Sequence, residues 1–483
     1  MGTVQLVCYP DSLGGDLRAL HTLLEGPLSG LFPGGVHILP PYPSSGDRGF
    51  APISYDLIDP AFGSWDDIKA IGDVVPVVLD LMVNHISQRS DYFQDFLTKG
   101  ETSAYADMFI QPDKLWPDGV PVKADVHQVF LRRRSPFSSY PVGDGSHTVT
   151  VWTTFGQTDP SEQIDLDINS SVTRQVLTGL LHNYQHNAVS SLRLDAVGYV
   201  VKKRGTSCFF VEPEIFEFLA WINAEAAKVG MSILPEVHAP LEIQHKLAAK
   251  GYWTYDFATP FLVLGALINH EVSHLVDYLR ARPERMVTML DCHDGIPVYP
   301  DVLGLAPEDH IQRTIDFTAS QGANFSRLIS AGDQDSTIDV HQINCTYLSA
   351  LGGDERAFLA ARAIQLFLPG IPQIYYVGLL AGTNCYRSLQ EQQDGRAVNR
   401  RNYTLQETIE AIAHPLVAKQ QELIHLRNDH PAFEGGFVID GAGTELKIGW
   451  HRGSHRCVLS VDTADYAIHI DYTMQTDSRM LVL

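Results

Sequence analysis

The sequence predicts an α/β fold in which eight parallel strands, alternating with helices, close into a (β/α)8 TIM barrel. Short apolar, β-branched runs recur along the chain, helix-like segments separate them, and acidic residues follow several runs at their C-terminal ends. Those ends are where this fold builds its active site. The expected strands are Val4 to Tyr9, Gly35 to Leu39, Val75 to Val83, Val189 to Leu194, Ser232 to Val237, Trp253 to Ala258, Met286 to Leu290 and Ile371 to Val377.

Two intervals between these runs are longer than one helix and its loops need. The interval after the third run holds a segment rich in Pro, Gly, Ser and Tyr, and the one after the seventh is rich in Asp, Gly, Gln and Ser. We expect an inserted subdomain after strand three and a second, loop-rich insertion after strand seven. Short alternating segments after Pro431, such as Glu445 to Trp450, Arg456 to Val461 and Tyr466 to Ile470, predict a C-terminal antiparallel β domain. The predicted parts are barrel segments 1–85, 165–291 and 352–432, insertions 86–164 and 292–351, and the β domain 433–483.

Composition limits the class of protein. A chain of 483 residues, 45% hydrophobic and 19% charged, is typical of a multi-domain enzyme. A net charge of -22 argues against nucleic acid or an anionic membrane surface as a partner. The six cysteines have no metal-ligand or redox spacing, and no signal peptide or long apolar run is visible, so we expect a cytoplasmic protein.

Arg193 and Asp195 end one of the predicted strands two positions apart. Residues i and i+2 of a strand project from one face, so both side chains would enter one pocket, where the cation would keep Asp195 ionised as a nucleophile requires. Glu236 and Asp294 occupy similar strand ends downstream. Each acid alone is more often a helix cap or a solvated loop residue. Together they predict retaining glycosyl transfer, with Asp195 as nucleophile, Glu236 as proton donor and Asp294 as transition-state stabiliser.

His85 and His293 place an imidazole beside these strand-end acids. A single histidine is usually a structural residue, but two beside catalytic carboxylates favour a role as donors to sugar hydroxyls. Metal binding is less favoured, because no His-x-x-x-His spacing accompanies them. We expect no metal and no cofactor.

Several motifs resemble those of the α-amylase superfamily: Asp80-Leu-Met-Val-Asn84-His85, Gln163-Ile-Asp-Leu-Asp167, Arg193-Leu-Asp195-Ala-Val-Gly-Tyr199, Pro235-Glu236-Val-His238 and Leu290-Asp-Cys-His293-Asp294. More narrowly, Gly-Val-His-Ile-Leu-Pro at 35–40 and Pro-Gly-Ile-Pro-Gln-Ile-Tyr-Tyr-Val-Gly at 369–378 are similar to the sucrose phosphorylase group of glycoside hydrolase family 13. This resemblance implies a double displacement in which phosphate accepts the glucosyl unit from the enzyme. It also implies a metal-free site, although Asn84 matches an asparagine that helps to bind calcium in many amylases.

The resemblance assigns the glucose-binding positions residue by residue. Arg400 would pair with the sugar or with Asp47, although the neighbouring Arg396 and Arg401 make a surface cation an alternative for any one of the three. The residues that match glucose-binding positions are Asp47, His85, Phe155, Gln163, Arg193, His293, Asp294 and Arg400.

Two loops depart from the sucrose phosphorylase pattern and bear on the leaving group. Arg132 to Arg134 stand where an Arg-Pro-Gly-Leu loop is typical, and His341 stands where a tyrosine is typical. Both departures favour an anion, because a guanidinium fork suits phosphate oxygens and a histidine beside a phosphate tends to be protonated. The pattern is similar to that of the sucrose 6(F)-phosphate phosphorylases. The predicted leaving-group and phosphate residues are Arg134, Tyr199, Asp339, His341 and Gln342.

Other functions stay open at this point. The arginines could serve only inorganic phosphate or lie on a solvated face, and a sucrose, glucosylglycerol or glucosylglycerate phosphorylase would share the glucose side. The remaining alternatives are a hydrolase, a transglucosidase and a catalytically silent member of the superfamily. The silent member is disfavoured because all three acids are present. The expected partners are a sugar or sugar phosphate and inorganic phosphate, bound by a monomer or a homodimer.

Overall fold

The structure, a computed structural model, describes residues 2–156, 162–327, 339–392, 394–474 and 477–482. The chain divides into two compact units by its internal contacts. Unit 1 consists of Met1–His37, His238–Arg327 and Ser336–Leu483, and unit 2 of Ile38–Val237 and Leu328–Asp335.

An eight-stranded parallel sheet carries the fold, and the prediction of a (β/α)8 barrel is confirmed. Its strands follow the order β10-β11-β15-β1-β2-β3-β8-β9. All eight predicted strands are present, most of them shorter at their ends than predicted, and their residues are mainly buried, as expected where both faces of a sheet are covered. The bounds are β1 (Gln5–Cys8), β2 (Val36–Ile38), β3 (Val77–Met82), β8 (Val189–Asp195), β9 (Ser232–Pro235), β10 (Thr254–Asp256), β11 (Met286–Thr288) and β15 (Ile371–Tyr375).

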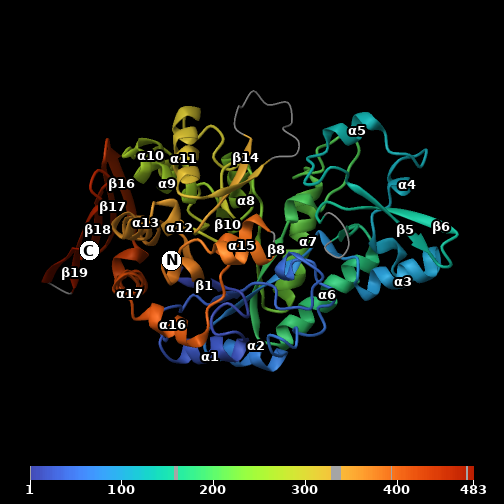
Figure 1. Cartoon of the computed structure of the whole chain (residues 1–483), viewed down its shortest axis with the longest axis horizontal. Helices are drawn as coiled ribbons and strands as arrows, with labels where there is room; N and C mark the ends of the chain where they lie inside the picture. The colour runs from blue at the N-terminus through green and yellow to red at the C-terminus, as the bar shows by residue number, and fades with distance from the viewer. Residues whose placement is uncertain (1, 157–161, 328–338, 393, 475–476, 483) are drawn as a thin grey trace. The chain divides into compact units, whose positions relative to one another are not determined.

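Helices alternate with these strands in both units (Figure 1). Polar caps start several of them: the Ser90 and Ser170 side chains accept hydrogen bonds from the first turns of α3 and α6. The helices of unit 2 are α2 (Trp65–Gly72), α3 (Asp91–Lys99), α4 (Pro112–Leu115), α5 (Lys123–Gln128), α6 (Ser171–His186) and α7 (Glu214–Lys228). Those of unit 1 are α1 (Leu17–Glu25), α8 (Leu241–Ala249), α9 (Thr259–Asn269), α10 (Ser273–Ala281), α11 (Glu308–Ser320), α12 (Tyr347–Ala350), α13 (Glu355–Phe367), α14 (Tyr376–Leu379), α15 (Tyr386–Gln392), α16 (Leu405–Ile412) and α17 (Pro415–Asp429).

The insertion after β3 has its own small core in unit 2. Its buried residues are Ile110, Trp116, Val129, Trp152 and Cys208.

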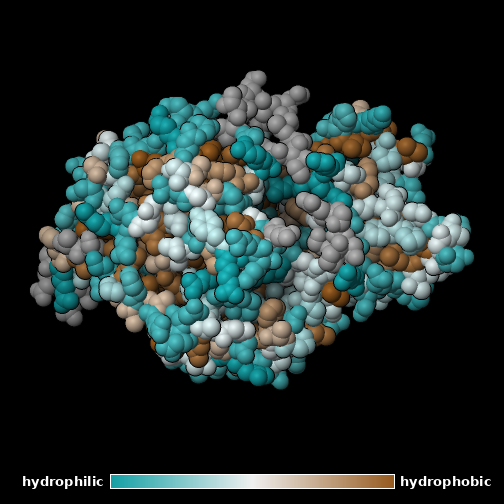
Figure 2. Space-filling model, viewed as in Figure 1, coloured by the Kyte–Doolittle hydropathy of each residue, from teal (hydrophilic) through white to brown (hydrophobic). Residues whose placement is uncertain are grey.

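Figure 2 shows hydrophobic residues at the surface over α5, whereas hydrophilic residues cover much of the rest of the visible face. The strands of this insertion form two antiparallel pairs, β4 (His85–Ser87) with β7 (Gln163–Asp165) and β5 (Phe137–Val142) with β6 (His147–Trp152). None of the described helices is long and apolar enough to cross a membrane.

The insertion after β11 contains more regular structure than its polar composition indicates. The thirteen-residue helix α11 buries a face that includes His310, Thr314 and Thr318, so it lacks a clear apolar stripe in the sequence. A three-stranded antiparallel sheet in the order β12-β14-β13 completes the insertion. Its strands are β12 (Ile296–Pro297), β13 (Asn324–Arg327) and β14 (Val340–Asn344).

A five-stranded antiparallel sheet ends the chain, and it contacts α10 and α13 within unit 1 (Figure 1). The three predicted strands are present, with one strand more on either side of them. The first strand, β16, was missed because its burial alternates only between half-buried and exposed residues, which leaves a weak hydrophobic pattern. The strands are β16 (Gly436–Ala442), β17 (Glu445–Arg452), β18 (His455–Asp462), β19 (Ala467–Met474) and β20 (Asp477–Val482).

Candidate active site

Arg193 and Asp195 project from the same face of β8, as their spacing predicts, and their side chains meet. Nη1 of Arg193 lies 2.9 Å from Oδ1 of Asp195 and also donates to the Asp80 carboxylate, while Nη2 lies 3.0 Å from Oε1 of Glu236. The second oxygen of Glu236 accepts a hydrogen bond from the backbone N–H of Ala196 at 2.7 Å. These four charged side chains are buried: Asp80 lies on β3, Arg193 and Asp195 on β8, and Glu236 directly after β9. One guanidinium therefore serves three carboxylates.

This crowding changes the expected proton affinity of Asp195. Burial raises its pKa well above the ordinary value, the nearby Glu236 carboxylate raises it further, and Arg193 only partly opposes them. The predicted effect of Arg193, which was to keep Asp195 ionised, is therefore opposed by burial and by Glu236. The prediction counted one cation against one acid, whereas Arg193 also serves Asp80 and Glu236.

An aromatic wall adjoins the carboxylates within unit 2. Nε2 of His85 lies 3.9 Å from Asp195 and donates to the Phe50 carbonyl oxygen at 3.0 Å. Burial lowers the pKa of His85, so its ring is neutral and donates from one nitrogen. The His85 and Phe155 ring centroids are 5.4 Å apart, and those of Phe155 and Tyr199 are 5.1 Å apart. Three predicted substrate contacts thus form one surface.

The other two predicted glucose contacts of unit 2 lie in neighbouring segments. Gln163 is buried on β7, where it pairs in register with Ser87 of β4. Asp47 lies in a short 3-10 turn with a φ of 48°, a left-handed conformation that is uncommon outside glycine. Their role in binding glucose stays a prediction.

Asp294 lies in unit 1 among cations. Nη1 of Arg396 lies 3.0 Å and Nη2 of Arg400 3.5 Å from its Oδ1, and Nε2 of His293 lies 3.9 Å from Oδ2. Nε of Arg400 also donates to the His293 carbonyl oxygen at 2.6 Å. Asp394 pairs with both arginines, at 3.3 and 3.5 Å, and thereby orients their guanidinium groups.

These cations lower the pKa of Asp294 well below the ordinary value: burial works against them, but His293, Arg396, Arg400 and His238 together outweigh it. Asp294 is therefore a permanent anion. Arg400 is only 1% exposed, so the surface-cation alternative does not apply to it. The alternative fits Arg401 better, because its side chain is 44% exposed and pairs with Glu407 at 2.7 Å.

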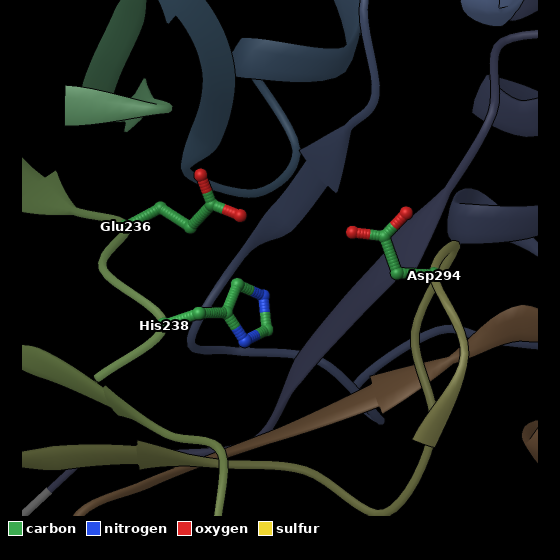
Figure 3. A group of neighbouring side chains, drawn as sticks. All are labelled: Glu236, His238 and Asp294. Carbon is green, nitrogen blue, oxygen red and sulfur yellow. The ribbon is translucent and has the colours of Figure 1, made fainter. Parts of the chain in front are cut away.

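Figure 3 shows Glu236, His238 and Asp294, side chains of the types that could hold a metal ion. Each has a partner within its own unit: Glu236 contacts Arg193, Asp294 contacts Arg396, and Nδ1 of His238 lies 3.1 Å from Asp301. The His238 ring also stacks on Phe257 with centroids 3.8 Å apart. A metal ion would have to compete with these contacts, and the expectation of a metal-free site stays a prediction.

The arginine triplet of the inserted segment does not act as one group. Nη1 of Arg133 pairs with Glu162 at 2.5 Å, and Glu162 also accepts hydrogen bonds from hydroxyl groups of two residues of β5. Arg132 is half-buried, whereas Arg134 is exposed. The triplet was predicted as a local anion site, and the structure leaves Arg134 as its solvent-facing member, with Arg133 committed to a carboxylate.

The second predicted leaving-group loop is split between surface and interior. Asp339 is largely exposed and pairs with Arg327. His341 and Gln342 are buried on β14, where Nδ1 of His341 donates to the Tyr299 carbonyl oxygen at 2.6 Å. Other parts of this loop lie outside the described residues, and the leaving-group roles stay predictions.

Several residues with close contacts to predicted site residues were missed by sequence reasoning. Position carries a usable signal for some of them: Asp80 opens the Asn84-His85 motif, and Arg396 lies four residues before Arg400. The register also pairs Asp80 with Arg193 across β3 and β8. The missed residues are Asp80, Glu162, Asp165, Lys202, His238, Asp394 and Arg396.

Known proteins resemble this chain over nearly its whole length. Residues 15–252 match the family described as "Alpha amylase, catalytic domain". The chain is 52% identical to a sucrose 6(F)-phosphate phosphorylase of Thermoanaerobacterium thermosaccharolyticum over 99% of each chain, and 42% identical to a sucrose phosphorylase of Streptococcus mutans over 98% of each. A crystal structure of sucrose 6F-phosphate phosphorylase from Thermoanaerobacter thermosaccharolyticum superposes with a TM-score of 0.97 at 50% identity, covering 100% of this chain and 98% of that one.

Proposed function

Because the chain belongs to the α-amylase family, glycoside hydrolase family 13, we propose that it is a retaining glucoside phosphorylase whose substrate is sucrose 6(F)-phosphate. The reaction is reversible phosphorolysis to α-D-glucose 1-phosphate and fructose 6-phosphate. The observation that carries the proposal is the 52% identity, over 99% of both chains, to an enzyme named for that substrate.

The first half-reaction uses the carboxylates around Arg193. An oxygen of Asp195 attacks the anomeric carbon while Glu236 protonates the glycosidic oxygen, so fructose 6-phosphate leaves and a covalent glucosyl-enzyme forms. This step needs one ionised and one protonated carboxylate. Arg193 contacts both acids, Asp195 through Nη1 at 2.9 Å and Glu236 through Nη2 at 3.0 Å, so its charge stabilises whichever of the two carries the negative charge.

The second half-reaction replaces the leaving group with phosphate. A phosphate oxygen attacks the anomeric carbon, the bond to Asp195 breaks, and the Glu236 carboxylate takes the proton from the incoming phosphate. Two inversions give α-glucose 1-phosphate with net retention. Asp294 is assigned to the positive charge that develops on the sugar, because its low pKa keeps it ionised at every stage.

The glucose-binding roles follow the family positions. His85 and Phe155 form a neutral, largely aromatic surface beside Asp195, which suits the packing of a sugar ring and a hydrogen bond to one hydroxyl. Asp47, Gln163, Arg193, His293 and Arg400 complete the proposed glucose-binding set. Tyr199, which packs against Phe155, is assigned to the leaving group or phosphate.

The leaving group is the finer part of the proposal, because the 42% identical sucrose phosphorylase shows how close enzymes with another substrate can be. We assign the phosphate of the substrate to Arg134 and His341, with Asp339 and Gln342 beside the fructose unit. A net charge of -22 means that a doubly charged phosphate has to be met by local cations. Arg134 is exposed and carries the guanidinium fork that matches phosphate oxygens.

The test is a substrate comparison in two buffers. The protein is incubated with sucrose 6(F)-phosphate and with sucrose, in phosphate and in a phosphate-free buffer, and glucose 1-phosphate and free glucose are both measured. We expect glucose 1-phosphate to form only with phosphate, and kcat/KM to be much higher for sucrose 6(F)-phosphate. Equal release of glucose without phosphate would instead identify a hydrolase, and a preference for sucrose would defeat the assignment of the leaving group.

A further inference from the structure

Lys202 has its ammonium group buried at the edge of the aromatic wall in unit 2. The side chain is only 2% exposed. Its Nζ lies 2.7 Å from Oδ2 of Asp165 and 3.0 Å from Oδ1 of Asn84, and it donates to the carbonyl oxygen of Tyr199. An ammonium has three hydrogens to donate, and three oxygens from three separate segments accept them here.

Asp165 is the anion of this pair, and it has no exposed surface. Its Oδ1 accepts the backbone N–H of Thr154 at 2.8 Å, and its Oδ2 accepts the Thr154 hydroxyl at 2.5 Å and the amide of Asn84 at 3.3 Å. A buried carboxylate without a cation is strongly unfavourable. The ammonium of Lys202 therefore compensates the buried carboxylate that holds the Thr154 and Asn84 segments.

Each segment joined by this ion pair carries a residue of the wall. His85 follows Asn84, Phe155 follows Thr154, and Tyr199 offers its own carbonyl oxygen. A shift of any of these segments would move one of the three rings relative to the other two.

We propose that Lys202 is a positioning residue for glucosyl transfer, acting as a built-in cation that holds the His85, Phe155 and Tyr199 segments in place through Asp165. Carboxylate, amide and carbonyl oxygens are also the ligands of hard metal cations, so a covalently attached ammonium makes this site independent of a supplied ion. The inference rests on the proposed function, because the wall is taken to contact the glucosyl unit.

The test uses Lys202→Ala with Lys203→Ala as a matched control. Lys203 is the next residue, but it is 50% exposed and pairs with Glu214. We expect Lys202→Ala to lower kcat/KM about a hundredfold, the scale of a displaced contact surface. The loss should be similar for sucrose and for sucrose 6(F)-phosphate, because His85 and Phe155 are proposed to contact the glucosyl unit that both substrates share. Lys203→Ala should keep the parental value.

Chemical rescue separates charge from packing. Propylammonium supplies the atoms that alanine lacks, and it should restore kcat/KM of Lys202→Ala, whereas propanol, which has nearly the same shape but no charge, should not. Equal rescue by propanol, or parental kcat/KM in folded Lys202→Ala, would overturn the proposal. An inactive parent protein would instead count against the proposed function.

A charge-balanced variant keeps the proposal testable if Lys202→Ala does not fold. Lys202→Met combined with Asp165→Asn removes both charges, so no buried ion is left unpaired. We expect this double variant to fold, as judged by thermal unfolding, and still to lose most of kcat/KM because the three segments are no longer tied to one centre. Parental activity in the double variant would show that the ion pair has no positioning role.

Discussion

Asp195 is buried and Asp294 half-buried, and the structure shifts the pKa values of these two aspartates of the proposed site in opposite directions. Around Asp195 one guanidinium serves three carboxylates, and the pKa of Asp195 rises. Around Asp294 two arginines and two histidines outweigh the cost of burial, and the pKa of Asp294 falls. Because both residues are aspartates, the difference in direction follows from the charges around them and not from residue type.

In the proposed mechanism the two clusters have different tasks. Asp195 and Glu236 need one proton between them, and both contact Arg193. Asp294 has to stay anionic throughout, which the cations around it favour. Removing a charged group from one cluster should therefore affect a different property of the enzyme than removing one from the other.

The largest expected effect comes from the nucleophile. Asp195→Asn should abolish turnover of every glucoside, because no covalent intermediate can form. Asp294→Asn should lower kcat by about 10² to 10³-fold, the range for loss of one group that stabilises developing charge, while the glucosyl-enzyme still forms. Mass spectrometry of the enzyme trapped with substrate checks this difference. A trapped adduct in Asp195→Asn would contradict the assignment.

Much of the fold could be predicted because apolar patterning is local. The barrel strands lie in short, largely apolar runs, acids follow several of these runs, and the i, i+2 rule placed Arg193 beside Asp195. The five-stranded sheet was harder, because β16 has no fully buried residue that would mark it as a strand.

The charge balance could not be predicted, because the partners lie far apart in the chain. Asp80 reaches Arg193 across 113 positions, and Arg396 reaches Asp294 across 102. The three consecutive arginines were predicted to form one anion site. In the structure Glu162, which lies outside the triplet, pairs with Arg133. Local spacing identifies which residues carry charge, whereas tertiary packing decides how those charges are shared.

Stability should change in opposite directions in the two clusters. A raised pKa means that Asp195 stabilises the fold only at acid pH and destabilises it once pH rises through the folded value, so Asp195→Asn should gain about 1 kcal/mol at neutral pH. Asp294 has a lowered pKa and stabilises the fold above its unfolded value. Asp294→Asn should therefore lose at least about 2 kcal/mol at neutral pH, somewhat less than a fully buried ion pair because Arg396 is 26% exposed.

Thermal and urea unfolding of both variants at neutral and acid pH checks this prediction. Both differences should shrink as pH falls toward the ordinary aspartate range, because the Asp195 carboxyl is then protonated in the folded and the unfolded protein and the Asp294 ion pairs lose strength. Destabilisation by both substitutions at neutral pH would show that the Asp195 cluster is not short of positive charge.

A substitution outside both clusters should separate the leaving group from the glucosyl unit. Arg134→Ala should cost about 1.5 to 3 kcal/mol in kcat/KM, the range of a hydrogen bond to a charged group, on sucrose 6(F)-phosphate alone. Variants of the two clusters should affect sucrose and its phosphate alike. Arg134→Lys is the matched control, and it should lose less because it keeps the charge without the guanidinium fork. An equal loss on both substrates would place Arg134 at inorganic phosphate instead.

The smallest expected effect is a shift of the pH profile. Removing one carboxylate from the Asp195 cluster should cause it, and removing one from the Asp294 cluster should not. Asp80 raises the pKa of Asp195, so Asp80→Asn should lower that pKa and move the acid limb of kcat/KM to lower pH, since the proposed nucleophilic attack needs an ionised Asp195. Asp394→Asn is the counterpart, because Asp394 competes with Asp294 for both arginines. Its loss would leave those arginines more fully to an aspartate that is already ionised, and the acid limb should stay in place. Movement of the limb in Asp394→Asn but not in Asp80→Asn would assign the titrating group to the Asp294 cluster and reverse the division of roles between the two aspartates.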